Sequence, residues 1–145
     1  EAVRAHGAVA MGLVKTPEEA TAKRPHTPKL AFVAKPADYV ASDGKPVQGD
    51  SVDLLARIFS MGQLHHAMTG TGAVALAAAA SIPGTIVHRL VPGGTDGRVR
   101  FGHPSGSLTV GAEAVEQADG WTVSKVVMSR SARRLMEGWV RIPAV

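Results

Sequence analysis

The stretch His65-His66-Ala67-Met68-Thr69-Gly70-Thr71-Gly72, followed without interruption by Ala73-Val74-Ala75-Leu76-Ala77-Ala78-Ala79-Ala80, decides the fold. Residues 65–68 are expected to form a short strand, and the glycines after them a tight turn. The alanine-rich part predicts a helix that is apolar on every side. Because such a helix has no face suited to water, the remaining chain must pack around it.

Strands are predicted after this helix. Residues 85–91 are rich in β-branched side chains, and residues 98–101 and 108–114 alternate apolar with polar positions. Pro92-Gly93-Gly94 and Asp96-Gly97 are expected to turn. Residues 121–132 and 135–142 are expected to form a terminal hairpin or two long strands.

Helices and one strand are predicted before it. Residues 1–13 have a helical composition, a short helix begins at Thr16, and residues 29–35 form a strand before the turn at residues 43–46. A helix from Asp50 or Ser51 to Gly62 is expected because Leu54/Ile58 and Leu55/Phe59 are spaced by four. The order predicts an α+β domain with a β-sheet around one buried helix.

Composition narrows the class of protein. The chain has 145 residues, 45% hydrophobic and 19% charged, which suits one globular domain. Cysteine is absent, so this sequence offers no disulfide or thiolate metal site. No apolar run is long enough for a bilayer and no signal peptide is recognised, so we expect a cytoplasmic protein without a membrane partner.

Nucleic acid is not an expected partner either. The formal net charge is +4, which by itself could suit nucleic acid. The basic residues are scattered, however, and only six aromatic residues are available to stack on bases. A basic balance suits small anions equally well. Glu1 to Ala5 resembles the middle of a helix and no initiator Met is present, so we expect a fragment of a longer chain.

The turn before the apolar helix is the strongest candidate binding site. Gly70, Thr71 and Gly72 let a ligand approach the backbone, and the unpaired amides at a helix start attract a carboxylate or phosphate. Thr69 adds a hydroxyl. The alternative is that the glycines only make the turn and the threonines only cap the helix.

Two adjacent histidines and a second glycine-containing loop are further candidates for a site. His65 and His66 are expected to point to opposite faces of a strand, so they are poor candidates for one metal. One of them is a candidate for substrate binding or proton shuttling, and a hydrogen-bonded structural imidazole is the alternative. Gly102-His103-Pro104-Ser105-Gly106 offers the Ser105 hydroxyl and loop amides to an oxyanion, with a plain connecting loop as the alternative. The arginines of residues 129–134 suit carboxylates, although solvated charge at a strand edge is more common.

Several motifs in order resemble the PrpF family. They are His65-His66-Ala67-Met68-Thr69-Gly70-Thr71, Ile82-Pro83-Gly84-Thr85, Gly102-His103-Pro104-Ser105-Gly106 and Met128-Ser129-Arg130-Ser131-Ala132-Arg133 through Met136-Glu137-Gly138-Trp139-Val140. This family includes methylaconitate isomerases and oxalomesaconate tautomerases. Its chains are much longer than this one, and the present sequence resembles their C-terminal portion over nearly its whole length.

The resemblance implies a fold similar to diaminopimelate epimerase, in which two lobes each curl a β-sheet around a central helix and the active site lies between them. Residues 1–145 would be the single C-terminal lobe. In the epimerase a catalytic cysteine precedes a similar Gly-Thr-Gly turn; Thr69 stands there in this chain, which argues against a two-thiol racemase.

The implied activity is proton transfer on an unsaturated tricarboxylate, with no cofactor or metal required. The resemblance places the proton-transfer groups in the upstream lobe, so the catalytic residues stay unassigned. His66, Thr69, Gly70, Thr71, Gly72, Ser105 and Gly106 are the expected substrate-binding residues. The implied partners are the tricarboxylate and the upstream lobe, and exposed strand edges separately suggest a homo-oligomer. The alternative is a catalytically incomplete carboxylate-binding or assembly module.

Overall fold

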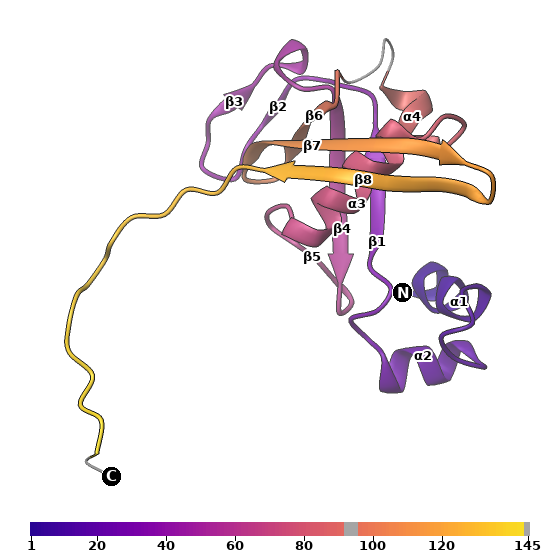
Figure 1. Ribbon diagram of the computed structural model, residues 1–145, viewed down its shortest axis with the longest axis horizontal. Coiled ribbons are helices and arrows are strands. Elements are labelled where there is room, and N and C mark those ends of the chain that lie inside the picture. The colour runs from indigo at the N-terminus through magenta and orange to yellow at the C-terminus, as the bar shows by residue number, and fades with distance from the viewer. Residues whose placement is uncertain (92–95, 144–145) are drawn as a thin grey trace.

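One mixed β-sheet and one helix packed against it form the body of the molecule (Figure 1). The computed structural model describes residues 1–91 and 96–143. Its helices are α1 (Ala2–Ala10), α2 (Pro17–Lys23), a 3-10 turn at Gly49–Ser51, α3 (Gly70–Ser81) and α4 (Ile86–Leu90). Its strands are β1 (Leu30–Ala34), β2 (Tyr39–Val40), β3 (Pro46–Val47), β4 (Leu54–Ser60), β5 (Gln63–Leu64), β6 (Arg98–His103), β7 (Gly106–Gln117) and β8 (Gly120–Met128).

The main sheet has the order β1-β4-β6-β7-β8, and β5 pairs with β4. Among the described strands of this sheet, β4 and β6 run parallel, and the other pairs are antiparallel. The sheet is strongly twisted, so in Figure 1 the β7–β8 hairpin crosses in front of α3 while β1 and β4 run behind it. The expected mixed α+β architecture with a curled sheet is therefore present.

The core lies between α3 and the sheet. Ala73, Leu76, Ala77 and Ala80 recur every three or four residues on the buried side of α3. They pack against inward-facing sheet residues, namely Leu54, Ala56, Val99, Phe101, Val110 and Ala112. The predicted helix is confirmed, but its expected complete burial is wrong, because the sheet covers one side and Ala75 on another side is exposed.

A second, smaller cluster joins α1 to α2. Ala5, Ala8 and Ala20 are buried with Val14 beside them. Arg4 is 3% exposed; it pairs with Glu1 and donates to the carbonyl oxygens of Arg24 at 2.9 Å and Thr27 at 3.0 Å. The Arg4 guanidinium holds the pKa of the Glu1 carboxyl at about 2. A buried charge with this many partners fixes the linker after α2.

The helix predicted from Asp50 to Gly62 is wrong. Residues 54–60 form strand β4, with Leu54, Ala56 and Ile58 facing the core and the residues between them facing outward. A spacing of four brings residues to one face of a helix, but four is also a multiple of two and therefore fits one face of a strand. Pairing with β1 on one side and β6 on the other decides for the strand.

The strand predicted over residues 85–91 is also wrong, since α4 occupies 86–90. Thr85 caps this helix: its hydroxyl oxygen accepts from the His88 amide at 3.0 Å and the hydroxyl donates to the Ala79 carbonyl. The cap outweighs the weak helix preference of Ile86 and Val87. The expected turn at Pro92-Gly93-Gly94 lies outside the described residues, whereas a turn at Asp96-Gly97 is present.

The strands predicted on either side of α3 and at the C-terminal end differ from the observed ones. Residues 65–68 form no strand, because only Gln63 and Leu64 pair with β4. The predicted strand over 121–132 is confirmed as β8 but ends at Met128, and residues 135–142 form no strand. Residues 129–143 instead extend away from the body (Figure 1).

A polar link fixes the parallel junction between β4 and β6. The Asp53 carboxylate accepts from the Arg100 amide at 2.7 Å and from its guanidinium at 2.6 and 3.1 Å. The Asp53 amide in turn donates to the Arg100 carbonyl at 2.8 Å. Burial by itself would raise the pKa of Asp53, but the bonds from Arg100 outweigh it and lower that pKa.

Replacing Asp53→Asn is therefore expected to lower the free energy of unfolding by about 1 kcal/mol at pH 7, because charge-assisted bonds are lost. The folded-state pKa lies below the unfolded one, so the stabilisation is present above the ordinary aspartate pKa and is lost as pH falls through the lower folded value. Urea unfolding of both chains from pH 7 to pH 3 measures this. Asp43→Asn, which removes an exposed ion pair with Lys45, is the control. If the free energy of unfolding of Asp53→Asn differs from that of the unchanged chain by the same amount at every pH, the account is wrong.

Candidate functional site

The candidate site lies at the start of α3, where several distant segments meet. Thr69 is the N-cap residue, and Gly70, Thr71 and Gly72 form the first turn. The amides of a first turn have no partner within the helix, so they present donors and the positive end of the helix dipole. The sequence-predicted residues Thr69 to Gly72 are thus placed together at one helix terminus.

Thr69 does not cap α3 with its side chain. The helix has no side-chain cap bond, and the buried Thr69 Oγ1 has no hydrogen-bond partner among the described residues. The alternative, that the threonines only cap the helix, is therefore wrong for Thr69. A buried hydroxyl without a partner costs free energy, and a ligand oxygen at this turn would satisfy it.

Gly72 has a packing role that the sequence did not reveal. A Cβ at this position would lie 2.5 Å from Ile58 Cδ1 and 2.5 Å from Thr69 Oγ1. The missing side chain leaves room at the first turn of α3 for the Ile58 side chain of β4 and for the Thr69 hydroxyl.

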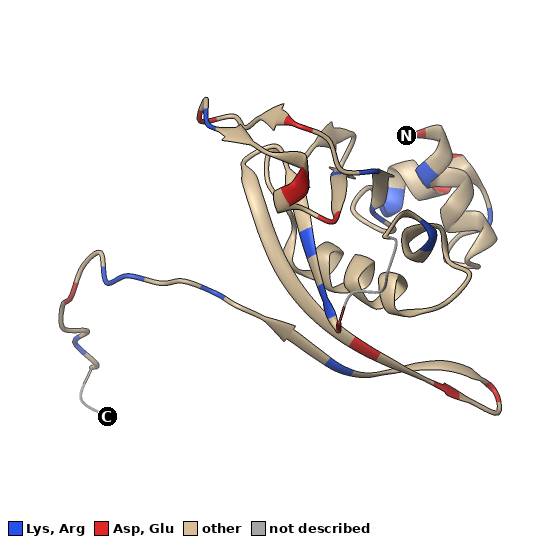
Figure 2. Ribbon diagram, turned by 90° about the horizontal axis from the view of Figure 1, so that it is seen from above, with Lys and Arg blue, Asp and Glu red and all other residues tan. Residues whose placement is uncertain are grey.

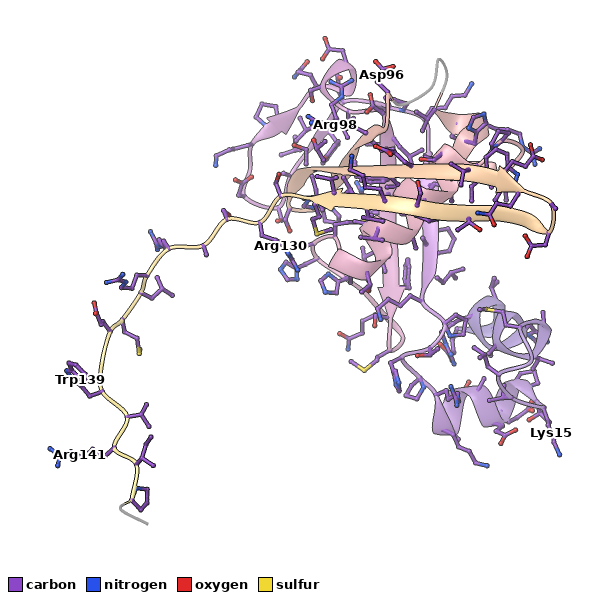
Figure 3. All side chains as sticks on the ribbon, viewed as in Figure 1. Lys15, Asp96, Arg98, Arg130, Trp139 and Arg141 are labelled. Carbon is purple, nitrogen blue, oxygen red and sulfur yellow. The ribbon has the colours of Figure 1, made fainter. Side chains whose placement is uncertain are left out.

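Arg130 is the residue that sequence reasoning did not place in the site. A Cβ on Gly70 would lie 3.1 Å from Arg130 Nη2, so the guanidinium lies directly beside the first turn of α3. Figure 3 shows Arg130 where the chain leaves β8. The arginine-rich segment was recognised as suited to carboxylates, but nothing local in the sequence joins residue 130 to residue 70.

The loop before α3 is held by the turn between β6 and β7. The Ser105 hydroxyl donates to the His66 carbonyl oxygen. The Ser105 amide donates to Nδ1 of His103 at 3.2 Å. Ser105 therefore lies beside the segment that leads into α3, with its hydroxyl proton directed to that loop.

Tyr39 fixes the same turn from the other side. Its hydroxyl lies 3.1 Å from the His103 carbonyl and 2.5 Å from the Gly106 carbonyl, and burial raises its pKa. Gly106 has φ +124, a conformation that favours glycine. Gly106 is thus placed as a turn residue whose carbonyl is already bonded, and no described contact joins it to α3.

His65 and His66 are not on opposite faces, because they lie outside a strand. Their rings stack with centroids 5.4 Å apart and 12° between planes. His103 is 8% exposed; burial, together with the nearby Arg57 and His66, lowers its pKa and favours a neutral imidazole. Among residues 1–91 and 96–143, no three His, Asp or Glu side chains converge as a metal site would require.

A shallow hollow of about 320 Å³ opens beside the first turn. Thr71 and Gly72 line it together with Ile58 and Lys29. The first turn of α3 thus has Arg130 beside Gly70, and Lys29 lines the hollow at Thr71 and Gly72. Neither cation has an ion-pair partner within the described parts of the chain, which makes the surroundings of the turn suited to an anion.

The basic residues of the described chain are spread over several elements (Figure 2). Figure 2 shows Lys and Arg scattered over the helices, the sheet and the C-terminal segment, with acidic residues between them. In the part of the chain that the structure describes, no helix has both the length and the apolar character needed to cross a bilayer.

Comparison with known proteins gives consistent relatives. A family profile described as “PrpF protein” matches residues 1–143. The 2-methyl-aconitate isomerase of Shewanella oneidensis is 60% identical over 143 residues, covering 99% of this chain and 36% of the relative. The 3-methylitaconate isomerase of Eubacterium barkeri is 41% identical over 144 residues, covering 98% of this chain and 37% of the relative.

A solved structure described as “Crystal Structure of Methylitaconate-delta-isomerase” matches with a TM-score of 0.80 and 38% identity, over 95% of this chain and 35% of that one. The chain therefore spans little more than a third of the length of these relatives.

The contact at Gly72 predicts a measurable coupling. Gly72→Ala is expected to lower the free energy of unfolding by about 1–2 kcal/mol, because overpacking outweighs the gain in helix preference. Ile58→Val removes the methyl group that the new Cβ would strike, so the double variant should lose less than the sum of the single variants.

Gly7→Ala in α1 is the matched control, since nothing lies within 4 Å of a Cβ there; it should stabilise the chain by about 0.5–1 kcal/mol. Urea unfolding of all five chains provides the values. If the effects of the changes at positions 58 and 72 are additive, the role of Gly72 is not to leave room for Ile58 Cδ1.

Proposed function

Since the chain belongs to the PrpF family, we propose that it supplies one lobe of an isomerase that transfers a proton on an unsaturated tricarboxylate of the aconitate type. This lobe corresponds to the C-terminal lobe of a diaminopimelate epimerase-like fold, with α3 as its central helix. The observation that carries the proposal is the first turn of α3, where free amides, the unpartnered Thr69 hydroxyl and the Arg130 guanidinium converge.

The chemistry follows from what this turn can stabilise. The carbon that loses its proton lies beside a carbon–carbon double bond that is conjugated with a carboxylate. Removing this proton moves negative charge onto the carboxylate oxygens. Fixed amides and a guanidinium aimed at those oxygens lower the energy of that charge more than water does. A base takes the proton and an acid returns one at another carbon, so the double bond shifts or changes geometry.

In this proposal the present chain binds the substrate, and the groups that transfer the proton lie outside it. Gly70, Thr71 and Gly72 bind a carboxylate through the backbone, while Thr69 and Arg130 orient it. His66 and Ser105 hold the approach to the turn, and Gly106 shapes the turn that carries Ser105. Neither a cofactor nor a metal takes part in this proposal, and oxalomesaconate-type tautomerisation is chemically the same kind of step.

The relatives guide the choice of substrate class. Proteins named for 2-methyl-aconitate and for 3-methylitaconate both align over nearly all of this chain. Unsaturated polycarboxylates share carboxylates beside a double bond, which suits an amide-lined turn flanked by cations. We further propose that the enzyme is cytoplasmic and has no nucleic-acid or membrane partner. A second copy pairs along the exposed edge of β8.

The direct test uses a chimeric enzyme in which this chain replaces the matching residues of the Shewanella relative. We expect it to change the ultraviolet absorbance of aconitate-type tricarboxylates, with the natural relative as positive control. A folded chimera that binds a tricarboxylate without turnover would contradict the isomerase and favour the catalytically incomplete binding module.

Arg130→Gln in this chimera is expected to raise KM about tenfold or more, since charge-assisted bonds contribute roughly 1.5–3 kcal/mol. Arg130→Lys should recover part of the loss, because an ammonium keeps the charge without the paired donors. Arg98→Gln, which removes an exposed arginine from the outer face of β6, is the charge-matched control. Equal KM values for the Arg130 and Arg98 variants would remove Arg130 from the site.

A further inference from the structure

The hollow beside the first turn of α3 has features that a single bound carboxylate does not use. It measures about 320 Å³, and the polar side chains that line it are His26, Thr27, Lys29 and Thr71. Ile58 and Leu76 are buried and give the hollow an apolar floor, whereas Lys29 is exposed beside them. An apolar surface next to a cation suits a short hydrocarbon chain that ends in a carboxylate.

The backbone that carries Lys29 is fixed on both sides. The buried Arg4 guanidinium donates to the carbonyl oxygens of Arg24 at 2.9 Å and Thr27 at 3.0 Å. The Thr27 amide also donates to the Arg24 carbonyl at 3.1 Å. Lys29 directly precedes β1, which pairs with β4. A ligand that pairs with Lys29 therefore has to order the lysine side chain but not its backbone, which lowers the entropic cost of binding.

Lys29 and Arg130 border neighbouring positions of the same helical turn. A Cβ on Gly70 would lie 3.1 Å from Arg130 Nη2, and the next residue, Thr71, lines the hollow together with Lys29. Consecutive Cα atoms are about 3.8 Å apart, so one small molecule can reach from Gly70 into the hollow. In the described parts of the chain neither cation has an acidic partner.

We propose that this hollow is a second carboxylate subsite, in which the Lys29 ammonium pairs with a substrate carboxylate other than the one held at Gly70 and Arg130. The inference rests on the proposed function and adds a reason for selecting polycarboxylates. With both carboxylates held, the hydrocarbon between them lies over Ile58 and is fixed from two ends. The relatives are named for 2-methyl-aconitate and 3-methylitaconate, which both belong to the class that such a pair of subsites selects.

Nuclear magnetic resonance of this chain tests the subsite with two ligands that differ by one carboxylate. Methylsuccinate is a dicarboxylate, and isobutyrate is the same molecule with hydrogen in place of one carboxylate. The amide shifts of Thr71 and Gly72 give the dissociation constants. We expect Lys29→Gln to weaken methylsuccinate binding about fivefold, as for an ion pair partly screened by water, and to leave isobutyrate binding unchanged. Lys29→Arg keeps the charge and should keep most of the affinity.

Lys35→Gln is the matched control, because Lys35 is exposed directly after β1 and does not line the hollow. If Lys29→Gln weakens both ligands equally, or if both variants weaken methylsuccinate equally, the proposal is wrong, since Lys29 then acts only through the overall charge. A chain that shows no saturable binding of methylsuccinate would overturn it as well. The same amide spectra show that each variant is folded.

The Shewanella chimera separates this proposal from the proposed function. In an active chimera, Lys29→Gln should raise KM for an aconitate-type tricarboxylate about fivefold with little change in kcat, because the pair forms equally in the ground state and the transition state. An active chimera whose KM does not respond to Lys29→Gln would overturn the second subsite and leave the isomerase. A chimera without turnover, in which methylsuccinate binding still depends on Lys29, would contradict the isomerase and support the subsite.

Discussion

The structure depends on the packing of the small residues of α3 against the sheet. Gly72 has no side chain where Ile58 Cδ1 needs the space, and the alanines after it keep the buried side of the helix shallow. Inward-facing side chains of β4, β6 and β7 can therefore all pack against this side of α3. Gly72 lies in the first turn of the helix, which is where the candidate site lies.

That helix start carries an electrostatic imbalance. Free amides and the positive end of the dipole already favour an anion, yet the Arg130 guanidinium lies beside them and Lys29 lines the hollow next to the same turn. Two like-signed features held together are unfavourable unless a negative group separates them. A substrate carboxylate at this turn would relieve the imbalance and would also give the buried Thr69 hydroxyl a partner.

Sequence patterns predicted the parts of this arrangement that are local. The apolar run after Gly70 and the alternation in residues 98–101 and 108–114 correctly predicted α3, β6 and β7. The pattern failed at β4, because pairs spaced by four fit both a helix and a strand, and the strand was decided by neighbours far away in sequence. It also failed at α4, where the hydroxyl cap of Thr85 outweighed β-branched composition.

Long-range contacts explain what was missed in the site. Arg130 approaches Gly70 only because β8 follows β7 along the sheet and ends near the start of α3. The most direct measurement is nuclear magnetic resonance of the backbone amides during titration with a tricarboxylate such as citrate. Our account predicts saturable shifts concentrated at Gly70, Thr71 and Gly72 and reduced in an Arg130→Gln chain. Shifts that appear elsewhere, or that do not depend on Arg130, would contradict it.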